Sequence, residues 1–232
     1  MSESVLVVVA HPDDEVLGMG ATARVLADRG YEVTAYFLSG EVTARQHRAR
    51  GHDFRAATPQ ASPLPGLRGP DLCPFPNNKM NTVPHLEMVQ YVEKAVADTG
   101  AQWIFTHHPG DINDDHRQVS QATQAAARLH QRGGGVGSLK GLFLMEIASS
   151  TDWTFKGAGE QFTPNTYFPI TEDALRSKVE ALNAYRGVMR PYPHPRSEEV
   201  LRGQVVLRGA ESGLGLSEAF QSVHLDLDGV MS

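Results

Sequence analysis

The sequence predicts one α/β domain, built on an open and mostly parallel Rossmann-like sheet with helices on both of its faces. Three observations predict this fold: a Val-rich apolar run at residues 5–10, an amphipathic stretch at residues 16–29, and a second apolar run at residues 31–38. Continuous apolar runs are typical of strands that are buried on both faces of a parallel sheet. A strand, a helix and a second strand in this order form a right-handed crossover unit. The length of 232 residues suits a single domain over residues 1–232.

The first helix is expected to stop at Gly30, because glycine favours a helix end. Gly18 and Gly20 lack the spacing of a nucleotide-binding loop, and we interpret them as sites of close helix–sheet packing. Residues 41–57 are polar and rich in Arg, and they are predicted to be helical. Residues 58–76 contain six prolines and are predicted to form a loop, of a kind that often borders a functional site.

Strand-like and helical patterns continue to alternate through the rest of the chain. Further strands are expected at residues 102–106, 142–148 and 165–170. Further helices are expected at residues 83–99, 116–131 and 171–186. Thr171 is the predicted N-cap of the last of these helices, and acidic residues follow it in the first turn. Pro191, Pro193 and Pro195 are expected to hold the next segment extended.

The charge and the cysteine usage limit the function. The formal net charge is -6 and the pI is near 5.9, so nothing favours binding to nucleic acid or to an anionic membrane, and a small-molecule substrate is expected. No apolar stretch is long enough for a transmembrane helix, and the first residues lack the pattern of a signal peptide. Cys73 is the only cysteine, so no internal disulfide can form, which favours the cytoplasm. A metal site would have to use His, Asp or Glu.

Histidine and aspartate gather in two loops, each directly after a predicted strand. The first loop is residues 11–15 and the second is residues 107–116. In open parallel sheets, ligands bind beyond the carboxyl ends of the strands, so both loops can face one crevice. The adjacent carboxylates of the first loop would raise one another's pKa on burial unless a cation compensates them. This pattern favours a metal site.

His11 and Asp14 lie three residues apart at a strand-to-helix turn, so both can point at one ion. A catalytic zinc typically has three protein ligands and one open position, and His116, at the start of the next predicted helix, is the best candidate for the third ligand. Asp13 is then placed to act as general base toward a zinc-activated water. His194, restricted by a proline on each side, is the proposed donor near the oxyanion.

At these residues the sequence resembles the PIG-L/LmbE-like deacetylase family. The stretches that carry the resemblance are residues 10–15 (AHPDDE), 75–84, 106–116 (THHPGDINDDH) and 190–197 (RPYPHPRS). The resemblance implies a Rossmann-like deacetylase with zinc on His11, Asp14 and His116 and with Asp13 as the base. It also implies an N-acetylated amino sugar of the glucosamine type as substrate, and homo-oligomers as a common state.

The second loop departs from the His-Pro-Asp-His pattern that many family members have. Asn113 stands where those members have the first His, and an amide cannot act as a general acid. Its role would either be absent or move to another group, such as His194 or Asp111. The family's Arg-x-x-Glu helix is matched only loosely, at residues 50–53.

Substrate binding is assigned to four residues. They are Arg48, Arg50, His108 and Asp111. The two arginines can clamp a phosphate or carboxylate, and a solvated helix face is the plainer reading. Of the adjacent histidines His107 and His108, one is expected to end the strand in the core and the other to line the site. Asp115 either caps a helix or orients a site His through a hydrogen bond.

Other interpretations fit the same residues. A zinc amidase acting on another N-acyl substrate or on a thiol conjugate would keep the metal site and change the pocket. A non-catalytic sugar-binding or metal-binding protein of the same fold would account for Asn113. On the plainest reading, the acids of the first loop only favour a helix N-terminus through its dipole, and His116 and His194 are structural.

Overall fold

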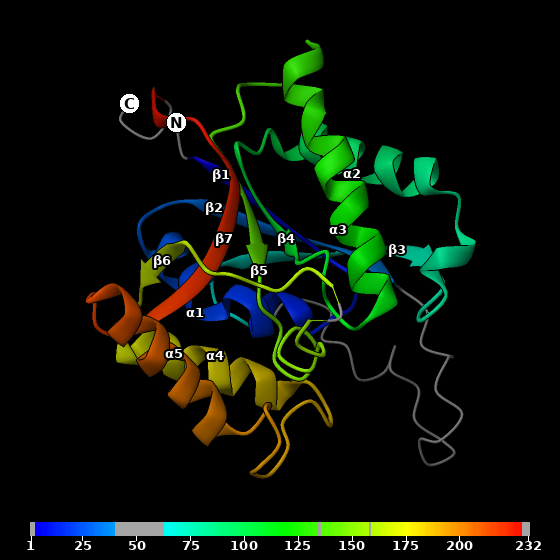
Figure 1. Ribbon diagram of the computed structural model, residues 1–232. Coiled ribbons are helices and arrows are strands. Elements are labelled where there is room, and N and C mark those ends of the chain that lie inside the picture. Colours follow the sequence, from blue (N-terminus) through cyan, green and yellow to red (C-terminus); the bar gives the residue numbers. More distant parts are fainter. Residues whose placement is uncertain (1–2, 40–62, 134–135, 158, 229–232) are drawn as a thin grey trace.

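The computed structural model describes residues 3–39, 63–133, 136–157 and 159–228, and within these residues seven strands form one sheet. The order across the sheet is β3-β2-β1-β4-β5-β7-β6. The strands are β1 (Ser4–Val9), β2 (Glu32–Ser39), β3 (Leu67–Phe75), β4 (Trp103–His107), β5 (Gly141–Met145), β6 (Thr166–Pro169) and β7 (Ser217–Leu225). Neighbouring strands pair parallel from β3 to β5, and β7 pairs antiparallel with β5 and β6. The predicted mostly parallel α/β sheet is confirmed (Figure 1).

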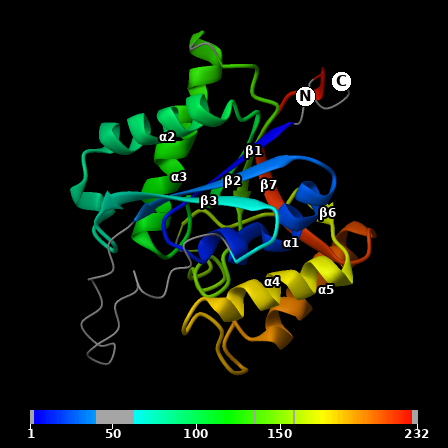
Figure 2. The same ribbon diagram turned by 180° about the vertical axis from the view of Figure 1, so that it is seen from behind.

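In the described part of the chain, five α-helices cover the two faces of this sheet. They are α1 (Asp14–Asp28), α2 (His85–Thr99), α3 (Asp114–Ala127), α4 (Glu172–Ala184) and α5 (Glu198–Ser212). The helices α2 and α3 lie on one face, and α1, α4 and α5 lie on the other (Figures 1 and 2). None of the helices described is both long enough and apolar enough to cross a membrane.

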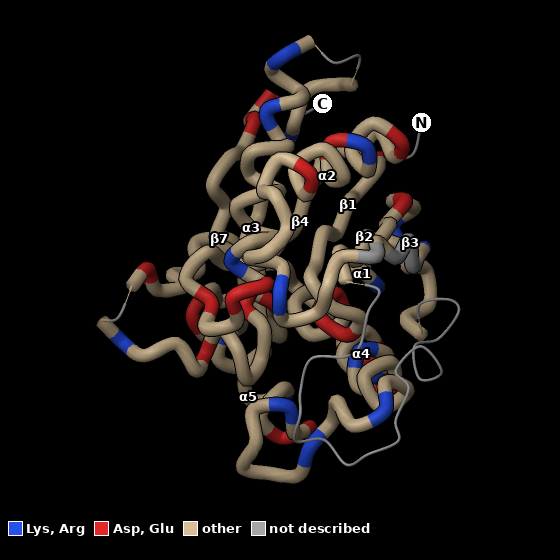
Figure 3. Tube along the Cα trace, turned by 90° about the vertical axis from the view of Figure 1, so that its right-hand side faces the viewer, with Lys and Arg blue, Asp and Glu red and all other residues tan. Residues whose placement is uncertain are grey.

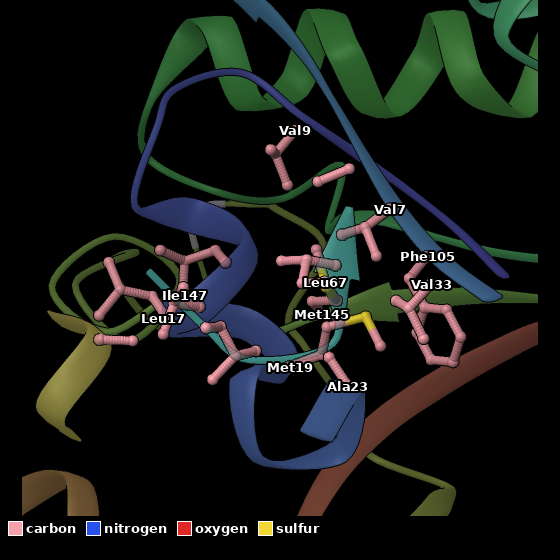
Figure 4. Close-up of a cluster of buried hydrophobic side chains, with 14 of the residues drawn as sticks. Val7, Val9, Leu17, Met19, Ala23, Val33, Leu67, Phe105, Met145 and Ile147 are labelled. Atoms are coloured by element: carbon pink, nitrogen blue, oxygen red, sulfur yellow. The ribbon is translucent and has the colours of Figure 1, made fainter. Parts of the chain in front are cut away.

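The apolar run of β1 is buried on both faces of the sheet. Val5, Val7 and Val9 belong to the hydrophobic cluster on the α1 side, whereas Leu6 and Val8 belong to the cluster on the α2 and α3 side. All five side chains are fully buried, which explains why the strand has a continuous rather than an alternating apolar pattern. Figure 4 shows the first cluster, where side chains of β1 and α1 meet.

Most of the predicted elements are confirmed to within a few residues. The helix predicted at residues 116–131 begins earlier, at Asp114, and its last turn is the 3-10 helix Arg128–Arg132. Thr171 caps α4, since its hydroxyl accepts a hydrogen bond from the Ala174 N–H at 3.1 Å. The packing role of Gly18 is also confirmed, because an added Cβ would lie only 2.9 Å from the Met145 sulfur of β5.

The loop predicted at residues 58–76 is wrong over Leu67–Phe75, which form β3. This strand lies at the edge of the sheet and pairs only with β2, with register shifts along the pair. An edge strand needs hydrogen bonds on one side only, so it tolerates prolines such as Pro70 and Pro74 that would interrupt a central strand. The helix predicted at residues 41–57 lies outside the described residues.

The segment after α4 also differs from the prediction. The prolines at 191, 193 and 195 do not hold it extended, because the His194 N–H bonds to the Pro191 carbonyl at 3.1 Å and the Ser197 N–H bonds to the His194 carbonyl at 2.9 Å. These turns lead into α5, which Ser197 caps. Past residue 197 no element is predicted, yet the chain forms α5 and β7. The buried stripe of α5 is narrow, with Leu201, Val205 and Gly209 as its buried residues, so its periodicity is weak.

Candidate metal centre

The two His- and Asp-rich loops meet where the strand order reverses. From β1 the chain proceeds through β2 to β3 on one side, and from β4 through β5 on the other. Such a switch point leaves a crevice beyond the carboxyl ends of the two central strands. The loops after β1 and β4 leave the sheet there, and α1 and α3 begin there. Figure 3 shows acidic segments gathered at this place, between the β4 and α5 labels.

His11, Asp14 and His116 bring three donor atoms together. His11 Nδ1 lies 3.2 Å from Asp14 Oδ2 and 3.3 Å from His116 Nε2, and the third side of the triangle, from His116 Nε2 to Asp14 Oδ2, is 3.2 Å. Tetrahedral ligands about 2.0–2.1 Å from a zinc ion are separated by about 3.3–3.4 Å. The three atoms therefore fit one tetrahedral cation, and they form the one group of this kind found among the described residues.

The charge around the triangle also favours a cation. Asp14 and His116 are almost completely buried, while the His11 side chain keeps 16% of its surface exposed. Burial alone would lower the pKa of His116, but the carboxylates of Asp14 and Asp111 raise it to about 10. Burial likewise disfavours the Asp14 carboxylate, yet His116 and His11 hold its pKa well below the usual range. A field that holds a proton this firmly on a buried imidazole would also hold a divalent ion.

Each of the two histidines of the triangle has an outer ring nitrogen, the one that does not belong to the triangle, and this nitrogen contacts a carboxylate. Asp111 Oδ2 lies 3.1 Å from His116 Nδ1, and Asp115 Oδ2 lies 3.1 Å from His11 Nε2. Carboxylates in this position fix the ring orientation and the tautomer of a metal-binding histidine. When a metal ion binds, they would hold the ring protons on the outer nitrogens and leave His116 Nε2 and His11 Nδ1, the two nitrogens of the triangle, free to act as ligands. Asp115 thus has the orienting position that was one of its two predicted roles.

Both orienting carboxylates are themselves held by hydrogen bonds. The Thr151 hydroxyl donates to Asp111 at 2.9 Å, and the Ser150 hydroxyl donates to the other oxygen of the same carboxylate. Asp115 accepts from the backbone N–H of Met80 at 3.1 Å and of Asn78 at 2.5 Å. Sequence reasoning missed these partners. The sequence feature that could have indicated them is the run of three hydroxyl side chains at residues 149–151, shortly after β5.

Asp13 adjoins the triangle in a strained conformation. Its φ of 117° and ψ of -28° are uncommon for a residue with a side chain. The backbone is held by its N–H bond to Glu15 at 3.0 Å and by the Leu17 N–H, which donates to its carbonyl at 2.9 Å. The carboxylate accepts from the Arg196 guanidinium at 3.0 Å. Burial and the charge of Asp14 raise the pKa of Asp13, and Arg196 lowers it.

Glu15 is fully buried and supports this turn. It accepts hydrogen bonds from the Tyr185 hydroxyl at 2.5 Å and from the Asp13 N–H at 3.0 Å. Burial raises its pKa to about 8, since neither partner is a cation. Glu15 therefore fixes the backbone of Asp13 and lies outside the triangle.

A family model described as GlcNAc-PI de-N-acetylase, PIG-L, matches residues 6–127, which is more than half of the chain. The chain belongs to the PIG-L family. The matched residues run from β1 to the end of α3 and include all three members of the triangle. The resemblance inferred from the sequence motifs is thereby confirmed.

Solved structures share the fold over the whole chain. A conserved protein of Thermus thermophilus has a TM-score of 0.74 and 22% identity, covering 98% of this chain and 97% of its own. The 4-carboxy-2-hydroxymuconate hydratase of Pseudomonas putida has a TM-score of 0.74 and 19% identity, covering 97% and 98%. N,N'-diacetylchitobiose deacetylase of Pyrococcus horikoshii has a TM-score of 0.71 and 21% identity, covering 100% and 89%. The comparison with curated proteins gave no match.

The two histidines that follow one another at the end of β4 separate. The His107 ring stacks on the His116 ring, with 3.9 Å between the ring centroids. Its Nε2 accepts a hydrogen bond from the Ala10 N–H at 2.8 Å. Burial lowers the pKa of His107 to about 3, so the ring is neutral. His108 is buried away from the triangle, where its Nδ1 accepts from the Gly110 N–H at 3.0 Å and its ring meets Phe162 edge-on. In this arrangement His108 does not line the metal site.

The other residues predicted at the substrate pocket have different positions. The Asp111 carboxylate is buried and is bound by His116, Ser150 and Thr151, so it orients the His116 ring rather than facing a substrate. Asn113 caps α3, since its side-chain oxygen accepts a hydrogen bond from the Asp115 N–H at 3.0 Å. Arg48 and Arg50 lie outside the described residues.

His194 is partly exposed on the segment that precedes α5. Its Nδ1 accepts from the Arg196 N–H at 3.0 Å, so a neutral ring carries its proton on Nε2. Burial, Arg196 and Arg190 together lower the pKa of His194. The ring therefore offers one N–H donor. It packs edge-to-face with the Trp153 indole, with 5.2 Å between the ring centroids.

Proposed function

We propose that the protein is a zinc-dependent hydrolase that removes the acetyl group from an N-acetylated amino sugar of the glucosamine type. The observation that carries the proposal is the triangle of His11, Asp14 and His116, whose donor atoms fit one tetrahedral ion, with the carboxylate of Asp13 one residue from a ligand. The PIG-L family description, a GlcNAc-PI de-N-acetylase, supports this substrate class, and so does the chitobiose deacetylase fold.

Each step of the hydrolysis has a candidate group. Zinc, when bound, would polarise the amide carbonyl and acidify the attacking water. Asp13 takes the proton of this water as its oxygen bonds to the acetyl carbon. The Nε2–H of His194 donates to the oxygen that gains negative charge. The C–N bond then breaks, the proton passes to the leaving nitrogen, and the products are acetate and the free amine.

Apolar side chains close to these groups suit the carbon face of a sugar ring. Trp153, which contacts His194, keeps 50% of its surface exposed, and Tyr192 on the His194 segment keeps 67%. Ile112, next to Asp111, keeps 44%. Exposed aromatic rings beside a polar site commonly provide the apolar part of a binding pocket. We assign the sugar ring to Trp153 on this basis.

The decisive experiment combines metal analysis with product detection. The zinc-loaded protein is incubated with N-acetylglucosamine, N,N'-diacetylchitobiose and lipid-linked N-acetylglucosamine, and released acetate and amine are measured. Asp13→Ala should retain about one zinc per chain and lose at least about 100-fold in turnover, because the base contributes about 10²- to 10⁴-fold. His11→Ala should lose the metal.

The alternatives give different results in the same assay. The fold alone does not select the reaction, since a structure that shares it is a hydratase. Amine release from other N-acyl or thiol-conjugate substrates only would indicate a different zinc amidase. If the protein binds stoichiometric zinc but releases no amine or acid from any amide substrate, it is a binding protein and the proposal is wrong.

A further inference from the structure

We infer that Arg196 is a positioning residue that holds the Asp13 carboxylate in its reactive orientation. This inference rests on the proposed function. The Nη1 of Arg196 donates to Asp13 Oδ2 at 3.0 Å. Its Nε donates to the Ser149 hydroxyl at 2.8 Å and to the Ala148 carbonyl at 3.2 Å. One guanidinium thus joins the loop after β1, the loop after β5 and the segment before α5.

The contact fixes the one part of Asp13 that its backbone leaves free. The bonds from Asp13 to Glu15 and Leu17 hold the main chain in its left-handed conformation, but they do not set the side-chain rotation. Arg196 binds Oδ2, and among the described residues Oδ1 has no hydrogen-bond partner. The free oxygen can therefore accept a proton while the bound oxygen keeps the carboxylate in place.

The same anchor also serves a metal ligand. Ser149 and Ala148 adjoin Ser150, whose hydroxyl contacts both Asp111 and His116 Nδ1, the latter at 3.3 Å. Thr151 holds this short segment by donating to Asp111 and by accepting from the Ile147 N–H at 2.8 Å. The base and the ligand histidine are therefore positioned against one segment, residues 148–151. Their relative placement depends on the arginine at one end and on the hydroxyls at the other.

A positioning role and a general structural role predict different results. The planar guanidinium makes two directed contacts at once, through Nη1 and Nε, which a lysine ammonium cannot reproduce. A misplacement of a catalytic group by about 1 Å can cost about 100-fold in rate. We therefore expect Arg196→Met to lower kcat by about 100-fold with KM changed less than about threefold, and Arg196→Lys to recover only part of this loss.

The test uses the zinc-loaded full chain and a substrate that the wild type hydrolyses. Zinc affinity of Arg196→Met, measured by competition with a chromophoric chelator, should stay within about threefold of wild type, since Arg196 touches no ligand atom of the triangle. Added guanidinium should restore about tenfold of the activity of Arg196→Ala, and ammonium should not. Arg202→Met, at an exposed arginine of α5 that pairs with Glu172, is the matched control and should have wild-type activity.

Three results would overturn the inference: a rise in KM with kcat unchanged, loss of zinc, or an equal effect in the Arg202 control. A substrate-independent measurement separates its failure from that of the proposed function. In a thermal unfolding cycle, the Tm changes of Asp13→Asn and Arg196→Met should not add up in the double variant, because each single change removes the same Arg196–Asp13 contact. Additive Tm changes would show that the two side chains do not interact. If the cycle is non-additive but the protein hydrolyses no amide, the Arg196–Asp13 interaction is supported and the proposed deacetylase activity is refuted.

Discussion

Replacing Asp111 should weaken zinc binding although the residue touches no metal. Asp111 Oδ2 lies 3.1 Å from His116 Nδ1 and holds that ring with Nε2 toward the triangle. Loss of such a partner typically costs about 10- to 100-fold in metal affinity, which is about 1.4 to 2.7 kcal/mol. Asp111→Asn keeps the shape and loses the charge, so about tenfold is expected. Asp111→Ala removes the contact, so about 100-fold is expected.

Zinc affinity is measured by competition with a chromophoric chelator, on protein whose folding is checked by thermal unfolding. Thr151→Val removes one hydrogen bond to Asp111 and should weaken zinc binding less than Asp111→Asn does. Thr154→Val is the matched control, because its hydroxyl bonds to the Gly110 carbonyl at 2.8 Å and does not touch Asp111. An Asp111→Asn affinity within about twofold of wild type, or an equal loss in Thr154→Val, would refute the reasoning.

Three further predictions concern the core, the pocket and the sheet edge. Glu218→Gln should lower the free energy of unfolding in urea by about 3 kcal/mol, because it leaves the buried Lys178 ammonium without its counter-charge; a loss below about 1 kcal/mol would contradict this. Trp153→Ala should raise KM for the amino sugar by about tenfold with little change in kcat, whereas a fall in kcat alone would argue against a stacking role. Burial raises the pKa of Cys73 on β3 to about 11, so the native thiol should resist alkylation at about pH 8 and react once unfolded, as mass spectrometry would show. Rapid labelling of the native protein would contradict the placement of β3.

The parts of the fold that could be predicted are those whose cause is local in the sequence. The strand β1 is identifiable because both of its faces are buried, so every residue from Val5 to Val9 is apolar. The ligand triangle is predictable for a related reason. Each of its members lies at or within a few residues of the junction between a strand and a helix, where the topology of a parallel sheet fixes the position of the side chain.

The parts that could not be predicted depend on contacts between distant segments. Arg196 meets Asp13 across 183 positions of sequence, and nothing in the local pattern of either residue specifies the other. The orienting role of Asp111 needs the hydroxyls that follow β5, which lie about 40 residues further along the chain. The strand β3 is hidden because its prolines are acceptable only at a sheet edge, and the position of an edge is a property of the whole sheet.

The site also shows why residue type alone does not assign a role. Four aspartates surround one point, and each is distinguished by what binds it. Asp14 faces the two histidines of the triangle, Asp111 and Asp115 hold the outer nitrogens of those histidines, and Asp13 is held by Arg196. An aspartate whose oxygens are occupied by hydroxyls, backbone N–H groups or imidazole has no capacity left for a reacting proton. Asp111 and Asp115 are occupied in this way at both oxygens. Asp14 faces the triangle through Oδ2, which leaves Asp13 as the aspartate that we expect to act as the base, positioned by Arg196 through its bound oxygen.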